Sequence, residues 1–150
     1  MIKGYTSITI DRPASEVFAA ISDITRTGEW SPECTAGRWL DGATGPGTGA
    51  RFEGDNSFVI AGVTLKKWTT TSEVTECVPG ELFEFVAAGY TTWRYELKPA
   101  GTGTSLTESF SFESPKGVKG FVVEKVMRRS ASMIKGMERT LTNVKESLES

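Results

Sequence analysis

The sequence predicts an α+β fold, in which a curved antiparallel seven-stranded sheet wraps on a long C-terminal helix, with two short helices after the first strand. Two changes of pattern support this fold. Apolar residues repeat with a period of two near the N-terminus and again from about residue 35 to residue 113, which is typical of strands. The C-terminal apolar residues instead repeat at the spacing of a helix.

A first strand is expected at residues 2–10, because every second residue there is apolar, small or threonine. A helix follows, since Pro13 and Glu16 stand where proline and acidic residues are favoured in a first helical turn. A second short helix over residues 24–29 must end before Pro32, because proline disfavours the helical conformation of the residue before it.

The middle of the chain is expected to form an antiparallel meander. Its stretches of period two are separated by breakers that contain glycine or proline, at residues 41–49, 78–80, 88–89 and 99–103. The connections are short, as they are in sheets whose neighbouring strands run in opposite directions. Six further strands are therefore expected, at residues 35–40, 49–60, 63–77, 81–88, 91–98 and 104–113.

The last third of the chain is expected to form one long helix. Its apolar residues alternate by three and four positions and so line one side: Ile134, Met137, Leu141, Val144 and Leu148. Such a continuous stripe predicts packing against the concave face of the sheet. Because 150 residues correspond to one domain and no linker interrupts them, residues 1–150 are expected to fold as a unit.

Composition excludes several classes of function. Seventeen Lys and Arg residues against nineteen Asp and Glu residues give a net charge of −2, whereas a nucleic-acid-binding domain is usually strongly basic. The chain contains no histidine, which removes Ser-His-Asp and Cys-His mechanisms and every histidine metal site. We therefore expect no metal, no cofactor and no nucleic-acid partner.

The compartment is inferred from the cysteines and from the apolar segments. Cys34 and Cys77 belong to no CxxC motif, so they are expected to be small hydrophobic residues in a reducing cytoplasm rather than a disulfide or a zinc site. The N-terminus runs directly into a strand pattern without the apolar segment of a signal peptide. No apolar stretch approaches the roughly 18 residues of a membrane span. A soluble, cytoplasmic protein without integral membrane association is expected.

A curved sheet with a helix across its mouth predicts an internal cavity, the usual form of a small-molecule site. Strand parity assigns the side chains that face inward. Most of them are aromatic: Phe52, Phe83, Phe85, Trp93, Tyr95 and Phe110. Trp68 shares its face with hydroxyl-bearing residues, whereas Arg51 and Arg94 are expected to face water.

Two polar residues, Asn56 and Glu108, share the parity of the apolar residues in their strands. An ionised carboxylate in such a place costs several kcal/mol unless it is paired, hydrogen-bonded or protonated. Glu108 therefore lies near an open strand end, bonds a neighbouring hydroxyl, orients a ligand in the cavity, or acts as a catalytic acid and base. For Asn56 the alternatives are a satisfied amide, a bulge position and a ligand contact.

Other candidate residues have two interpretations each. Trp30 follows the second helix and is expected near the cavity entrance, where it either fills the core or supports a ligand. Met127, Met133 and Met137 on the C-terminal helix either line an adaptable pocket or provide ordinary helix–sheet packing. The glycine-rich segment 45–49 leads into a strand and lacks the Gly-Lys-Ser/Thr ending of a phosphate-binding loop.

Seven short motifs follow one another along the chain: PASEVF at 13–18, GEWSPE at 28–33, GARFEGDN at 49–56, WTTT at 68–71, PG at 79–80, WRYEL at 93–97 and TES at 107–109. Through the order and spacing of these motifs, the chain resembles the START-like (SRPBCC) superfamily, specifically its polyketide cyclase/dehydrase-type proteins. The resemblance covers essentially the whole length. The resemblance implies a helix-grip (START/Bet v 1-like) fold around a deep hydrophobic cavity for lipids, polyketides or other apolar molecules. It fixes no reaction, because the superfamily includes cyclases, hormone receptors and lipid carriers.

Three functions are compatible with the sequence. The first is binding or transport of a hydrophobic small molecule (lipid, polyketide or aromatic metabolite), oriented by Asn56 and Glu108. The second is a polyketide cyclase or dehydratase in which Glu108 transfers protons and Tyr95 bonds a carbonyl. The third is a protein-interaction module, and a homodimer is compatible with each. The residues expected to contact the ligand are Trp30, Phe52, Asn56, Trp68, Phe83, Phe85, Trp93, Tyr95, Glu108, Phe110, Met133 and Met137.

Overall fold

The computed structural model describes residues 1–113 and 121–150, with side chains over 1–113 and 127–150. The predicted α+β fold is confirmed, and the strand ends lie within one or two residues of their expected positions. The second short helix is a 3₁₀ helix. In chain order the elements are β1 (Ile2–Ile10), α1 (Ala14–Ile21), η1 (Ile24–Glu29), β2 (Cys34–Trp39), β3 (Arg51–Ile60), β4 (Val63–Val78), β5 (Leu82–Ala87), β6 (Thr91–Ala100), β7 (Gly103–Phe112) and α2 (Phe121–Glu149).

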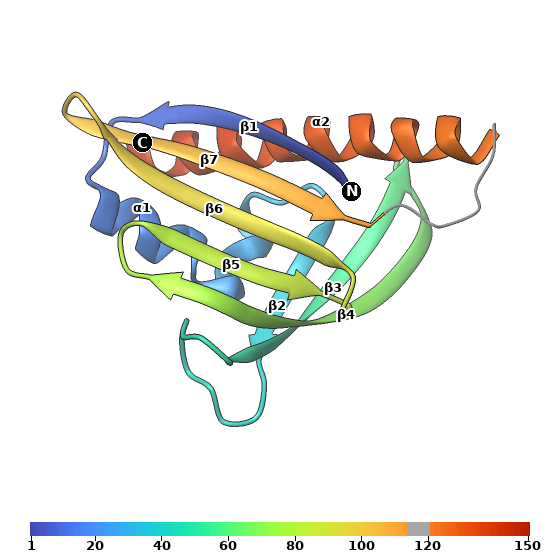
Figure 1. The fold of residues 1–150 in the computed structure, drawn as a ribbon, viewed down its shortest axis with the longest axis horizontal. Coiled ribbons are helices and arrows are strands. Elements are labelled where there is room, and N and C mark those ends of the chain that lie inside the picture. Colours follow the sequence, from blue (N-terminus) through green and yellow to red (C-terminus); the bar gives the residue numbers. More distant parts are fainter. Residues whose placement is uncertain (114–120) are drawn as a thin grey trace.

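The strands form one antiparallel seven-stranded sheet in the order β1-β7-β6-β5-β4-β3-β2. Strands β2 to β7 pair in sequence, as a meander does, and β1 completes the sheet beside β7. Figure 1 shows the sheet bending around the short helices, with α2 running along β1. Helix α2 packs mainly on β1, whereas η1 packs on β2 at the opposite edge.

Two glycines permit the close approach of η1 to β2. A Cβ atom on Gly37 would lie 2.3 Å from the carbonyl oxygen of Ile24, and one on Gly28 would lie 2.3 Å from that of Thr35. Real Cβ atoms essentially never come so close to a backbone oxygen. The side chain of Asp23 fixes the start of η1 by accepting a hydrogen bond from the backbone N–H of Thr25 at 3.1 Å.

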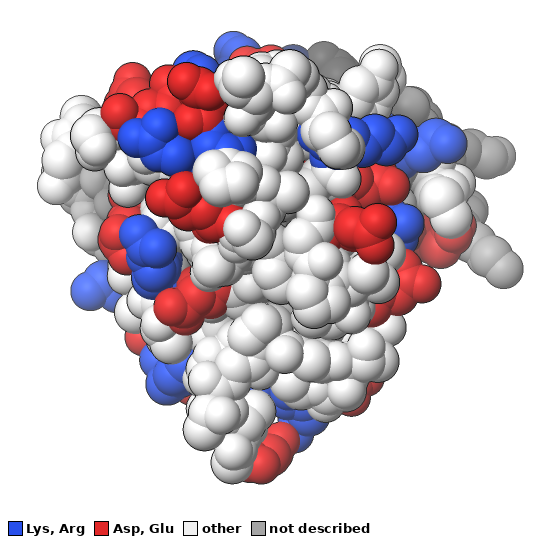
Figure 2. Space-filling model, turned by 90° about the vertical axis from the view of Figure 1, so that its left-hand side faces the viewer, with Lys and Arg blue, Asp and Glu red and all other residues white. Residues whose placement is uncertain are grey.

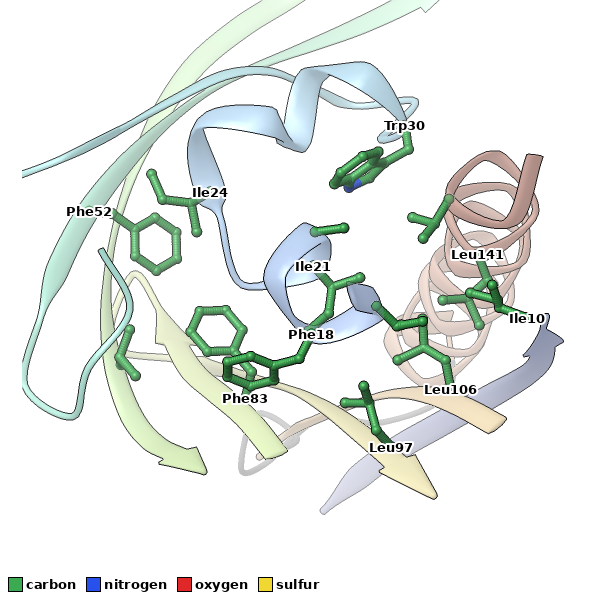
Figure 3. Close-up of a cluster of buried hydrophobic side chains, with 14 residues drawn as sticks. Ile10, Phe18, Ile21, Ile24, Trp30, Phe52, Phe83, Leu97, Leu106 and Leu141 are labelled. Carbon is green, nitrogen blue, oxygen red and sulfur yellow. The ribbon is translucent and has the colours of Figure 1, made fainter. Parts of the chain in front are cut away.

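The main hydrophobic cluster lies where α1, η1 and the C-terminal half of α2 meet the concave face of the sheet (Figure 3). Phe18 of α1 packs edge-on against Phe83 of β5, with ring centroids 6.5 Å apart. The labelled members of this cluster are Ile10, Phe18, Ile21, Ile24, Trp30, Phe52, Phe83, Leu97, Leu106 and Leu141.

A second, smaller cluster lies at the other end of β7. Phe110, Phe112 and Met137 are its buried members. Gly4 of β1 allows this packing, because a Cβ atom there would lie 2.8 Å from a ring carbon of Phe110. The concave face of the sheet therefore carries two apolar regions, and the residues between them determine what the fold can bind.

Candidate functional site

Three polar residues lie side by side on the concave face, on neighbouring strands. The register pairs Thr6 of β1 with Glu108 of β7, and Glu108 with Tyr95 of β6. We call Thr6, Glu108 and Tyr95 the polar row. Residues directly opposite each other in antiparallel strands have neighbouring side chains. Parity alone assigned Glu108 and Tyr95 to the inner face, and strand pairing brings them together.

The polar row separates the two hydrophobic clusters. On one side, Leu106 of β7 and Leu97 of β6 are in register and belong to the main cluster. On the other side, Phe110 and Trp93 are in register, with ring centroids 5.9 Å apart, and belong to the second cluster. The row is therefore a narrow polar strip within an otherwise apolar surface.

Glu108 is the buried acid of the polar row, with 5% of its surface exposed. Its Oε1 accepts a hydrogen bond from the Tyr95 hydroxyl at 3.0 Å. Its Oε2 is also buried and has no hydrogen-bond partner among the residues that the structure describes. Burial raises the pKa of Glu108 to about 8, against the opposing effect of the Tyr95 hydrogen bond. Around neutral pH the carboxyl group is therefore mostly protonated.

Tyr95 remains a neutral hydrogen-bond donor. Its pKa is raised well above the ordinary value by burial of the hydroxyl, and further by Glu108 and by Cys34. Cys34 belongs to β2 and Tyr95 to β6, so this electrostatic effect acts between strands that are not neighbours in the sheet. Burial also raises the pKa of Cys34, whose thiol donates a hydrogen bond to the carbonyl oxygen of Ala36.

Cys34 was expected only as a small hydrophobic residue, and its electrostatic effect on Tyr95 was not predicted. No motif in the sequence points to this position. The effect joins β2 and β6, which are separated by three strands in the strand order. Both Cys34 and Cys77 are free thiols.

Asn56 lies on the inner side of β3, but its amide is engaged within the sheet. Its Nδ2 donates hydrogen bonds to Thr70 Oγ1 at 3.1 Å and to the carbonyl oxygen of Gly54 at 3.3 Å. It pairs with Cys34 next to a register shift in β2. Of the alternatives for Asn56, the structure therefore favours a satisfied amide beside a bulge.

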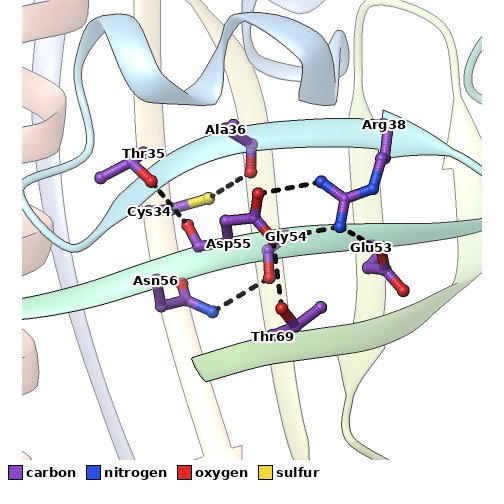
Figure 4. Close-up of polar contacts among 9 residues, drawn as sticks. All are labelled: Cys34, Thr35, Ala36, Arg38, Glu53, Gly54, Asp55, Asn56 and Thr69. Carbon is purple, nitrogen blue, oxygen red and sulfur yellow. Dashed lines mark hydrogen bonds and ion pairs between the residues drawn. The ribbon is translucent and has the colours of Figure 1, made fainter. Parts of the chain in front are cut away.

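Figure 4 shows the polar contacts of β2 and β3 around Asn56, together with an ion-pair network. Arg38 contacts Glu53 and forms two hydrogen bonds with Asp55, each of 3.0 Å. The guanidinium lowers the pKa of Asp55, and a hydrogen bond from Thr69 acts in the same direction. These groups are partly exposed, so their ion pairs contribute little to stability.

Most of the predicted aromatic and methionine residues belong to one of the two clusters. Trp30, Phe52 and Phe83 are buried in the main cluster, and Phe85 packs against it at 5.0 Å from the ring of Phe52. Trp93, Phe110, Met133 and Met137 belong to the second cluster. Two residues lie outside both clusters: Trp68 is half-buried on β4, and Met127 is 67% exposed on α2.

The two arginines that parity assigned to the solvent side are ion-paired there. Arg94 contacts Glu84 at 2.6 Å and Glu76 at 2.9 Å, and Arg51 contacts Asp41 at 2.9 Å. Figure 2 shows cationic and anionic side chains interspersed on one end of the molecule. That face therefore presents no broad field of one sign.

A separate surface groove of about 500 Å³ lies beside α1, at the loop between β2 and β3. Phe18 and Trp39 form apolar parts of its wall, together with Pro46 of the loop. The residues that line it include none of the polar row. Over the described ranges, no helix is long and apolar enough to cross a membrane. The same ranges contain no group of three or more side chains suited to hold a metal ion.

Comparison with known proteins agrees with this fold. A family model described as polyketide cyclase/dehydrase and lipid transport matches residues 1–149. A polyketide-cyclase-like protein of Corynebacterium glutamicum is 38% identical, with 98% of this chain and 91% of that chain covered and a TM-score of 0.66.

Two more distant structures show the shared fold. A protein of Nitrosomonas europaea has a TM-score of 0.74 at 14% identity, with 99% of this chain and 94% of that chain covered. An AHSA1-like protein of Aeromonas hydrophila has a TM-score of 0.66 at 18% identity, with 99% and 92% covered. A search of curated proteins finds no match.

Proposed function

Since the chain belongs to the polyketide cyclase/dehydrase and lipid transport family, we propose that it binds or carries a hydrophobic small molecule within its fold. The ligand is a lipid, a polyketide or an aromatic metabolite that has an apolar body and one neutral oxygen atom. The apolar body contacts the aromatic residues beside the polar row, and the oxygen atom lies at Glu108. The free thiols of Cys34 and Cys77 support a reducing, cytoplasmic setting.

The unpartnered Oε2 of Glu108 is the observation that carries this proposal. Most buried polar atoms in proteins have a hydrogen-bond partner, and an unmade bond costs about 1–3 kcal/mol. With Glu108 protonated, one carboxyl oxygen accepts from Tyr95 and the other carries a proton to donate. A ligand carbonyl or hydroxyl oxygen satisfies this donor without bringing a charge into an apolar region.

The test compares pairs of ligands that differ only in the oxygen atom. Long-chain ketones and alcohols, and aromatic ketones, are compared with the matching hydrocarbons by thermal shift and native mass spectrometry. We expect the oxygenated member to bind about tenfold more tightly, as one satisfied hydrogen bond predicts. The Glu108→Leu variant should lose this preference, whereas Glu96→Gln on the opposite face of β6 should keep it.

The pH dependence of ketone affinity provides a second, more specific test of Glu108. Ketone affinity should fall as the pH rises through about 8, because ionised Glu108 no longer donates. Glu108→Gln keeps a donor at every pH, so its ketone affinity should be independent of pH. If neither ligand set binds, or if Glu108→Leu retains the preference for oxygen, the proposal fails.

The alternative function is a cyclase or dehydratase, and one observation favours it. A carboxyl group with a pKa of about 8 can both give and take a proton near neutral pH, as a general acid and base must. In this case Glu108 moves the proton and the Tyr95 hydroxyl bonds the substrate carbonyl. A Glu108→Gln variant that binds a polyketide substrate but loses turnover would support the enzyme. Unchanged turnover would remove Glu108 from the mechanism.

A further inference from the structure

The hairpin formed by β3 and β4 projects beyond the rest of the sheet as a two-stranded arm. Pairing of β2 with β3 ends at Asn56, apart from one backbone hydrogen bond from Ser57 to the segment before β2. Pairing of β4 with β5 ends at Ser72, apart from one from the N–H of Ala88 to Thr71. Within the described part of the chain, residues 58–67 form strand pairs only within this hairpin. We call residues 58–67 the arm.

The arm is apolar on both faces and yet exposed. Its five large apolar side chains are each exposed to half or more of their surface: Phe58 50%, Val59 50%, Ile60 52%, Val63 60% and Leu65 59%. A two-stranded hairpin is only marginally stable in water, and a contiguous apolar patch marks a contact surface. The arm therefore presents an apolar tip whose surface would become buried on contact with an apolar partner.

The charges of the arm indicate the kind of partner surface that it fits. Lys66 and Lys67 are its only charged residues, and no acidic residue lies between Asp55 and Glu73, although the whole chain has a net charge of −2. Both lysines are exposed and lie at the base of the apolar tip, Lys66 opposite Phe58 and Lys67 opposite Ser57.

Trp68 follows the lysines, half-buried, with the Lys66 ammonium 5.4 Å from its ring centroid. From the tip toward the sheet, the order is thus apolar residues, cations and a tryptophan. This is the order in which side chains meet the acyl chains, the anionic headgroups and the interface of a membrane.

We propose that the arm is a docking element for an anionic lipid surface, with the apolar tip in the acyl boundary and Lys66 and Lys67 at the headgroups. This is peripheral contact and adds to ligand binding at Glu108 without depending on it. An anionic lipid is favoured over a second copy of the chain because two copies would bring like-charged lysines together. The arm would hold the protein at the surface from which an apolar ligand is taken.

Co-sedimentation of the full chain with phosphatidylcholine vesicles containing about 30% phosphatidylserine tests the proposal. We expect binding that is weaker on pure phosphatidylcholine and falls with added salt. The variant K66E/K67E should lower the partition coefficient at least about tenfold. The matched variant K3E/K98E, with the same net charge at other exposed sites, should bind much more strongly than K66E/K67E.

A second pair of variants tests the apolar tip. Phe58→Ser/Ile60→Ser/Val63→Ser should lower partitioning at least about tenfold, and Tyr5→Ser/Val78→Ser, at exposed sites outside the arm, should not. Circular dichroism and light scattering report folding and oligomeric state for each variant. The proposal is overturned if the wild type does not bind the anionic vesicles, or if arm and control variants lose binding equally. A dimer that the arm variants dissociate, without vesicle binding, would assign the arm to a second copy and also overturn it.

Discussion

The Tyr95 hydroxyl and the Glu108 carboxyl meet at 3.0 Å across the β6–β7 pair, and this contact engages only one of the two carboxyl oxygens. The pair is enclosed by apolar residues on both sides along the strands. Its consequences for stability can be measured without knowing the ligand, because a buried acid links folding to pH.

The first prediction concerns the pH dependence of stability. The folded pKa of Glu108 is about 8, above its ordinary 4.5, so the folded state holds this proton more tightly than the unfolded state. Its contribution to the free energy of unfolding is therefore complete below about pH 4.5, declines as the pH rises, and levels off above about 8. The slope in that window approaches about 1.4 kcal/mol per pH unit.

Urea unfolding of the wild type and of Glu108→Gln at several pH values tests this prediction. The difference in unfolding free energy between the two proteins isolates Glu108 from other titrating groups. We expect the unfolding free energy of Glu108→Gln to rise steadily, relative to that of the wild type, from pH 5 to 8. Glu73→Gln, at an exposed position on β4, serves as the control and should follow the wild type. A constant difference between Glu108→Gln and the wild type would contradict a buried, protonated Glu108.

The second prediction concerns Tyr95→Phe. This change leaves Glu108 Oε1 without its donor and keeps the ring in place, which should cost about 1–3 kcal/mol of unfolding free energy at neutral pH. Because the lost hydrogen bond favoured the ionised form, the pKa of Glu108 should rise further. The pH window of the first prediction then extends to higher pH, which urea unfolding measures. An unchanged window would show that the hydrogen bond is not made in solution.

The third prediction uses the two cysteines as reporters. Cys34 acts electrostatically on Tyr95, so a ligand seated at the polar row should slow the reaction of its thiol with a maleimide. Cys77 is the internal control, because its thiol is also free and burial likewise raises its pKa. Labelling rates at each cysteine can be followed by peptide mass spectrometry. Equal protection of both thiols would indicate general stabilisation rather than a ligand near Cys34.

The fold could be predicted closely from the sequence because its signals are local. The alternation in β7 is complete, with every second residue buried from Thr104 to Phe112, and the turn before β6 contains Ala88 and Gly89. Both of these turn residues have positive φ angles, at 55° and 67°. Patterns of this kind depend only on neighbours in the chain, so the strands were predicted to within two residues.

The candidate site was predicted only in part, because it depends on register. Parity places Glu108 and Tyr95 on the inner face, but it does not show that they are paired, nor that Thr6 completes the row. The electrostatic effect of Cys34 on Tyr95 acts between strands that are not neighbours in the sheet, and no local pattern records it. The exposure of the arm was not predicted either, because Phe58 has the same strand parity as the inward-facing Phe52 and yet half of its surface is exposed.

The last prediction concerns Gly37, which lets η1 lie against β2 and so positions the segment that leads to Cys34. In Gly37→Ala the new methyl group would meet the Ile24 carbonyl oxygen at 2.3 Å, and a backbone atom cannot rotate away. The helix must shift, and we expect a loss of at least about 2 kcal/mol in unfolding free energy. Gly47→Ala is the control, because outside its immediate chain neighbours no heavy atom lies within 4 Å of the position that its new methyl group would take. It should change stability by less than about 0.5 kcal/mol. Since η1 abuts β2, Gly37→Ala should also speed maleimide labelling of Cys34 relative to that of Cys77. Unchanged labelling rates would mean that η1 does not control access to the Cys34 thiol.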